Sequence, residues 1–182
     1  MNVDCVIGID VGKGGGITYW KPNCHAVSVK MPATAKDFNR LLDYIKEISQ
    51  QPICFIEKVQ VRFDDTEENK GKIFRIKAML QNYEQLKAVL ELAGVPYIMV
   101  HPMKWQNALN LRIRGKKVPE TKAERKRRYK DIAQDLYPEI NATLWNADAT
   151  LIMHFGRYAL KNDLNFIKGN LPDEQRSGLL SF

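Results

Sequence analysis

The feature that most constrains the fold is a continuous apolar run over residues 53–59, which reads ICFIEKV. Short runs of this kind are typical of strands buried on both faces, as in parallel sheets covered by helices. A helical pattern precedes the run, from residue 34 or 35 up to Pro52, and a longer one follows it over residues 73–93. The sequence therefore predicts a layered α/β fold.

The first third of the chain predicts an antiparallel meander of three strands, over residues 3–10, 17–20 and 25–31. The later part alternates a short strand with helices and ends in an irregular tail. We expect the strand over residues 97–100 and the helices over 105–109, 121–137 and 147–160. The whole order predicts one domain over residues 1–182. Its core is a mixed five-stranded sheet, three antiparallel strands and then two parallel ones, flanked by helices.

Composition excludes several classes of protein. With 182 residues, of which 45% are hydrophobic, the chain is long enough to bury a core without disulfides. No apolar run approaches the roughly 20 residues of a membrane-spanning helix, and the first residues do not read as a secretory signal, so we expect a cytoplasmic protein. The three cysteines form no CxxC pair, which argues against a thiolate zinc site.

The positive charge of the chain is concentrated in one segment. Residues 112–130 hold ten Lys or Arg and two acidic residues, a local balance of +8, whereas the whole chain carries +7. A basic block of this kind attracts a polyanion. The alternative is a solvated helix face. Nucleic acid is the expected partner.

Three carboxylates lie where burial is expected. Asp10 ends the first strand, Glu57 lies in the apolar run, and Asp148 opens an apolar helix. A buried charge requires a partner, a cation or a shifted pKa. Each also has a simpler interpretation: a turn residue, an ion pair at a sheet edge, or a carboxylate at a helix N-terminus. Together with a basic segment, they suit a Mg²⁺ or Mn²⁺ site that acts on phosphodiesters.

Four segments resemble a known family: GIDVGKGGGI at 8–17, FIEKV at 55–59, HPMKW at 101–105 and NADATLIMHFG at 146–156. Together they resemble the RuvC-like Holliday junction resolvases, most closely the shorter, phage-type members. The resemblance spans roughly residues 3–160. It implies a ribonuclease H-like fold, a homodimer, and Mg²⁺-dependent nicking of four-way DNA junctions in symmetric pairs.

The resemblance also implies roles for residues of the site. Asp10, Glu57 and Asp148 match the family's metal ligands, with Asp10 bridging two Mg²⁺ ions, for which Mn²⁺ substitutes, and a metal-activated water as the nucleophile. Among lysines that would neutralise charge at the phosphorus, Lys122 is the best match, and Lys104 and Lys126 are further candidates. The family usually has a second acid or a histidine three or four residues before the last Asp. This chain has Trp145 and Leu144 there, which leaves Asn146 as a weaker oxygen ligand.

The expected partners are branched DNA and a second copy of the chain. The helix over residues 73–93 is the expected dimer interface, since it has more apolar positions than one face requires and the matching helix packs between subunits in the family. We expect DNA contacts from the basic segment and its neighbours, with Phe63 as a wedge between bases: Lys104, Arg112, Arg114, Lys116, Lys117, Lys122, Arg125, Lys126 and Phe63.

Three other functions remain open from the sequence. A ribonuclease H-type nuclease would cut RNA–DNA hybrids with the same fold. A catalytically weak or inactive protein that binds branched DNA would be consistent with the missing fourth ligand. An actin-type ATPase also opens with a GIDxG motif, but the chain is too short for that two-domain architecture.

Overall fold

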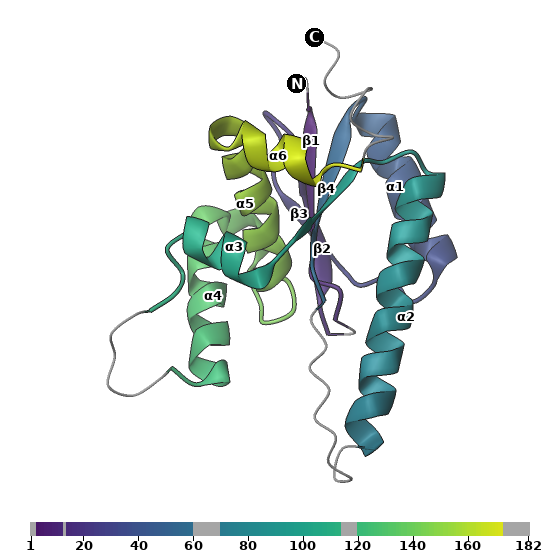
Figure 1. Cartoon of the computed structure of the whole chain (residues 1–182). Helices are drawn as coiled ribbons and strands as arrows, with labels where there is room; N and C mark the ends of the chain where they lie inside the picture. Colours follow the sequence, from purple (N-terminus) through teal and green to yellow (C-terminus); the bar gives the residue numbers. More distant parts are fainter. Residues whose placement is uncertain (1–2, 13, 60–69, 114–119, 173–182) are drawn as a thin grey trace.

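The structure is a computed structural model that describes residues 3–12, 14–59, 70–113 and 120–172. Its centre is a five-stranded sheet in the order β3-β2-β1-β4-β5 (Figure 1). The neighbours β1, β2 and β3 are antiparallel, and β4 and β5 run parallel to β1. The prediction of three antiparallel and two parallel strands is confirmed. The strands are β1 (Cys5–Ile9), β2 (Gly16–Trp20), β3 (Val27–Lys30), β4 (Pro52–Glu57) and β5 (Tyr97–Val100).

Helices cover both faces of the sheet. Two of them, α1 and α2, lie on one face, and α3 to α6 lie on the other (Figure 1). The first set is α1 (Ala35–Ile48) and α2 (Lys70–Leu92). The second set is α3 (Pro102–Ala108), α4 (Lys122–Leu136), the 3₁₀ turn η2 (Pro138–Ile140), α5 (Ala147–Asn162) and α6 (Leu164–Asn170). In the part of the chain that the structure describes, no helix is long and apolar enough to cross a membrane.

Alternate residues of each central strand enter different cores, which explains the continuous apolar run. In β4, Ile53 and Phe55 pack beneath α5, while Cys54 and Ile56 pack beneath α1 and α2. All four side chains have no exposed surface. Because both faces are covered here, positions 53–56 are all apolar.

Two glycines allow α5 to lie directly on the sheet. A Cβ atom at Gly8 of β1 would come within 2.3 Å of the carbonyl oxygen of Ala149 and the amide nitrogen of Met153. A Cβ atom at Gly156 would come within 2.5 Å of the Phe55 ring. The helix that carries Asp148 is therefore fixed against β1, the strand that Asp10 directly follows.

The expectation of an irregular tail after residue 162 is wrong, because α6 forms there. Asp163 caps this helix by accepting the backbone N–H of Phe166 at 3.1 Å. Ile167 and Leu171 are buried in the core that lies between the sheet and α5, and Phe166 packs on it. The helix is only seven residues long, so its pattern is too brief to distinguish from a loop in the sequence.

Candidate active site

Three chain segments bring carboxylates to one edge of the sheet. Asp10 directly follows β1, and Glu57 is the last residue of β4. These strands are parallel neighbours with Ile9 opposite Ile56, so the residues that follow, Asp10 and Glu57, leave the sheet side by side. Asp148 lies in the first turn of α5, the helix that packs on β1. The Asp148 residue is buried, with 8% of its surface exposed.

Burial and the neighbouring negative charges raise the pKa values of two of these carboxylates, Asp10 and Glu57. Burial raises the pKa of Asp10, and the charge of Asp148 raises it further, while Lys126 lowers it. Burial also raises the pKa of Glu57 to about 7, with a further increase from Asp10 and a decrease from the hydrogen bond that Trp105 donates. Mutual repulsion of buried carboxylates is the electrostatic signature of a cation site.

One lysine already contacts this carboxylate cluster, which we define as Asp10, Glu57 and Asp148. The ammonium of Lys126, on α4, forms an ion pair with Asp148 Oδ2. Burial lowers the pKa of Lys126, but the contact with Asp148 and the attraction of Asp10 and Glu57 outweigh burial, so the pKa is raised. Lys126 is therefore a charged part of the cluster.

Lys122, the lysine favoured from the sequence, lies one turn before Lys126 and is exposed. Within the part of the chain that the structure describes, Lys126 forms an ion pair with a carboxylate of the cluster and Lys122 does not. Both lysines lie on the face of α4 that carries the buried Tyr129 and Ala133, so helical register alone does not distinguish them, and what differs is their position along the helix. The sequence favoured Lys122 and gave Lys126 as a further candidate, and Lys126 is the residue that the fold brings to Asp148.

The glycine-rich turn packs tightly around Asp10. The backbone N–H of Gly12 donates to Asp10 Oδ1 at 3.4 Å. A Cβ atom at Gly15 would come within 2.3 Å of the Asp10 carbonyl oxygen and 2.9 Å of Oδ2. A Cβ atom at Gly16 would come within 2.7 Å of the Trp145 ring. The glycines therefore let the chain turn back closely over Asp10 and leave room for Trp145.

The donor set of the cluster fits a hard divalent cation. All its ligand atoms are carboxylate oxygens, which Mg²⁺ and Mn²⁺ prefer. Asp148 Oδ1 is buried and accepts no hydrogen bond within the described structure, so it is a polar atom that lacks compensation. No three His, Cys, Asp or Glu side chains of the described ranges are grouped so that they could hold a metal ion as they stand. The cation in contact with Asp148 is instead Lys126.

The cluster opens into a hollow of about 280 Å³. Asp10 and Glu57 line it, together with Met79 of α2 and Pro102 at the start of α3. The remaining lining residues are Val11, Gly12, Lys58 and Val59. Solvent and ions therefore reach two of the three carboxylates from the side on which α2 passes the ends of β1 and β4.

The positions before Asp148 do not supply a fourth ligand of the usual kind. Leu144 is exposed, and the Trp145 ring packs at Gly16. Asn146 is buried, and its side-chain oxygen accepts hydrogen bonds from the backbone N–H of Thr143 at 2.7 Å and from its hydroxyl at 3.0 Å. The structure thus gives the Asn146 oxygen a role in shaping the turn into α5.

Two basic residues near the site are held in ion pairs within the protein. Lys104 contacts Asp163 at 2.8 Å and lies over the Phe166 ring, so it joins α3 to α6. Arg128 donates to both carboxylate oxygens of Glu120 at 2.8 Å and to the carbonyl of Leu111 at 2.9 Å. Arg128 therefore ties Leu111 to Glu120, which lies just before α4.

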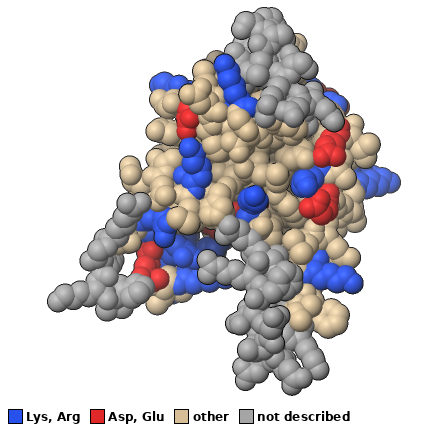
Figure 2. Space-filling model, in the orientation of Figure 1, with Lys and Arg blue, Asp and Glu red and all other residues tan. Residues whose placement is uncertain are grey.

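Other basic residues are available to a polyanion. Figure 2 shows basic side chains gathered at the lower left of the molecule, over the region of α4. Arg112, Lys122, Arg125 and Arg127 are exposed. The expected DNA contacts of Phe63, Arg114, Lys116 and Lys117 lie outside the described residues. The described part of the segment forms a cationic surface next to the carboxylate cluster, because Lys126 belongs to both.

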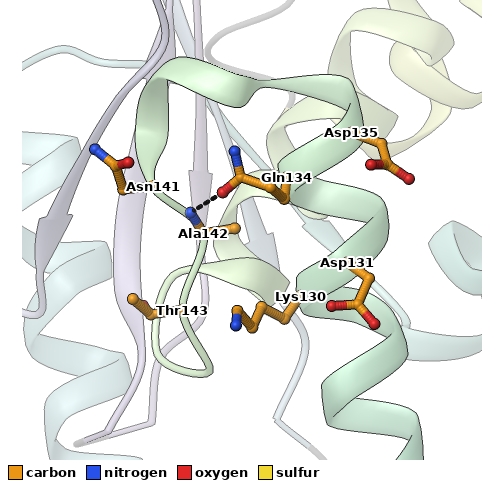
Figure 3. A pocket seen from close by; sticks show the side chains of 7 residues that line it. All are labelled: Lys130, Asp131, Gln134, Asp135, Asn141, Ala142 and Thr143. Carbon is orange, nitrogen blue, oxygen red and sulfur yellow. Dashed lines mark hydrogen bonds between the residues drawn. The ribbon is translucent and has the colours of Figure 1, made fainter.

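A larger hollow, of about 570 Å³, lies between α4 and the turn that leads into α5 (Figure 3). Gln134 accepts the backbone N–H of Ala142 at 2.7 Å and donates to the carbonyl of Pro138 at 3.0 Å. In Figure 3, Asp131 and Asp135 point away from this turn. Gln134 thus fixes the connection that sets where α5, and with it Asp148, begins.

The fold is similar to that of a solved structure, Thermus thermophilus RuvC in complex with a Holliday junction substrate. The match covers 88% of this chain and 96% of that chain, with 17% sequence identity and a TM-score of 0.53. The fold is that of RuvC. A second Thermus thermophilus RuvC structure matches 86% of this chain and 95% of its own, with the same TM-score and identity. No protein-family model matches the sequence, and no curated protein is similar enough in sequence to match.

Proposed function

We propose that this chain is a divalent-metal-dependent endonuclease that resolves four-way or branched DNA by paired, symmetric nicks. The observation that carries the proposal is the convergence of Asp10, Glu57 and Asp148 with Lys126 on a RuvC fold. Three carboxylates from separate elements and a cationic helix form one site for a metal and a phosphate. The resemblance to phage-type members and a cytoplasmic location are parts of the same proposal.

Asp10, Glu57 and Asp148 would hold the divalent ions, which we propose to be two Mg²⁺ per site. Bound ions of this kind supply activation of a water molecule and stabilisation of the leaving oxygen. Lys126 would then exchange its contact with Asp148 for the negative charge that develops on the phosphate. Lys122 and Asn146 stay candidates of lower rank, because Lys122 is exposed and the Asn146 oxygen is engaged by Thr143.

The test is cleavage of a synthetic immobile four-way junction with Mg²⁺, with Mn²⁺ and with EDTA. We expect paired nicks at symmetric positions only with a divalent metal. A linear duplex and an RNA–DNA hybrid of the same length serve as further substrates. Preferential cutting of the hybrid would support a ribonuclease H-type activity instead, and junction binding without nicking under any metal would support a protein that only binds branched DNA.

Neutralising exposed arginines of α4 will weaken junction binding and its dependence on salt. Replacing Arg125 and Arg127 by Gln removes two exposed cations, so the slope of log K against log salt should fall by about 0.9 for each lost phosphate contact. Fluorescence anisotropy between 50 and 200 mM salt measures the slope. Gln in place of Lys36 and Arg40 on α1, across the sheet, is the matched control. An unchanged slope in the α4 variant would contradict the proposed DNA surface.

We further propose that the chain is a homodimer through α2. Six exposed positions of this helix repeat with the alternating spacing of four and three residues that is typical of helix pairs, and none of them is charged. They are Phe74, Ala78, Gln81, Gln85, Ala88 and Leu92. Phe74 is 75% exposed and Leu92 is 88% exposed, which is a high apolar exposure for a free surface.

The dimer is tested by the mass in solution. Light scattering should give about twice the 21.0 kDa of one chain, and Ala78→Glu with Ala88→Glu should return it to the monomer, because four like charges would meet in the interface. Ala123→Glu, at an exposed alanine of α4, is the matched control. A monomeric wild type would refute the interface.

A further inference from the structure

We propose that Trp105 is a positioning residue: its indole N–H holds the Glu57 carboxylate and thereby sets the affinity of the cluster for divalent cations. This inference rests on the proposed metal dependence and adds a determinant to it. Trp105 lies in the segment HPMKW, one of the segments that resemble the resolvases. Nothing in the chemistry of a tryptophan makes it a metal ligand, so its part in the site has to be indirect.

The contact is a hydrogen bond from a fully enclosed donor. Trp105 Nε1 lies 3.1 Å from Glu57 Oε1, and Trp105 is 1% exposed. A buried indole N–H that loses its acceptor carries the cost of an unsatisfied polar group. The hydrogen bond therefore satisfies the buried indole N–H and also restrains the position of Glu57 Oε1.

The ring of Trp105 is fixed independently of Glu57. It packs edge-on against the Tyr129 ring, with centroids 5.6 Å apart, and belongs to the core cluster that also contains Leu111. The helix that carries it begins at Pro102, after His101 accepts the backbone N–H of Met103 at 3.1 Å. The donor is thus anchored by α3, α4 and the core, and it does not depend on the metal for its orientation.

A neutral donor is suited to this place. Glu57 experiences the negative charges of Asp10 and Asp148, which favour a carboxylate that turns away from the cluster. The indole N–H restrains one oxygen without adding a positive charge that would compete with a cation. A carboxylate has about four lone-pair sites, so one hydrogen bond leaves capacity for a metal. Loss of such an orienting partner typically reduces metal affinity by about 10- to 100-fold.

The test is metal binding without DNA. Trp105→Phe keeps an aromatic ring beside Tyr129 and removes the donor together with the five-membered ring that carries it, so titration calorimetry with Mn²⁺ should show a dissociation constant about 10- to 100-fold higher than wild type. Trp20→Phe makes the same change at a tryptophan that stacks under Arg157, and its affinity for Mn²⁺ should equal that of wild type. Circular dichroism and thermal unfolding without metal check that both variants are folded.

A second measurement on the wild-type chain does not depend on that variant. The chain has three tryptophans, so the indole N–H resonance of Trp105 is assigned by the loss of signals in Trp20→Phe and Trp145→Phe. Mg²⁺ should shift this resonance with the midpoint that calorimetry with Mg²⁺ gives. Wild-type affinity in Trp105→Phe, or an indole signal unmoved by saturating Mg²⁺, would overturn the inference and leave the nuclease proposal intact. A wild type that binds no Mn²⁺ would overturn both.

Discussion

Asn in place of Asp10 or Asp148, or Gln in place of Glu57, will abolish metal-dependent nicking of a four-way junction while the junction is still bound. Each change keeps the shape of the side chain and removes one negative charge from the cluster. We expect cleavage to fall by about 10²- to 10³-fold or more, because charge stabilisation at the reacting phosphate is the largest contribution such a site makes. Single-turnover cleavage at saturating protein separates this effect from binding.

Binding should be unchanged or tighter in these three variants. The carboxylates repel DNA phosphates, so their neutralisation removes an unfavourable charge contact. Asp131→Asn, at an exposed carboxylate of α4, is the control for the same chemical change outside the cluster. Wild-type cleavage in all three cluster variants would show that the reaction occurs elsewhere on the protein.

Gly8→Ala will destabilise the protein strongly. The new methyl group would lie 2.3 Å from backbone atoms of Ala149 and Met153, and 2.7 Å from the Cβ atom of Met153. Backbone atoms of a packed helix cannot give way as the end of a flexible side chain can, so α5 would have to move away from β1. We expect a loss of about 3 kcal/mol or more in the free energy of unfolding, measured by urea denaturation.

The control for this prediction is Gly169→Ala in α6. A Cβ atom there meets nothing within 4 Å, and alanine is the better helix former by up to about 1 kcal/mol, so stability should stay equal or rise. If Gly8→Ala is as stable as wild type, α5 does not lie as closely on β1 as described. A folded but displaced α5 would also carry Asp148 away from Asp10, and Mn²⁺ affinity would fall with it.

The sheet was predictable because burial on both faces leaves a simple pattern. Residues 53–56 are all apolar because β4 packs between two helical layers. The alternation of apolar and polar residues in the first third of the chain reflects the antiparallel strands. The three carboxylates were predictable for the same reason: a charge in an apolar run stands out. Short α6 was not predictable, since seven residues give too little periodicity to distinguish a helix from a loop.

The partners of the carboxylates were harder to predict. Lys126 and Lys122 are one turn apart on the same face of α4, and only the packing of α4 along α5 shows which of them comes to Asp148. The contact of Trp105 with Glu57 joins residues 48 positions apart, and no local pattern marks it. The sequence gives no partner for Lys104, but in the structure Lys104 forms an ion pair with Asp163, the N-cap residue of α6. Such pairings depend on tertiary structure alone.

The helix α4 stands outside α5 in the layer order, whereas the carboxylates belong to β1, β4 and the first turn of α5. The carboxylates, the anionic half of the site, are therefore carried by the most buried elements of the molecule. Lys126, the cationic half, lies on the peripheral helix α4. If the proposed function holds, an incoming nucleic acid strand would meet the peripheral half first. Lys126 would then move from Asp148 to a phosphate by rotation of its own side chain, and the elements that carry the carboxylates would not need to move.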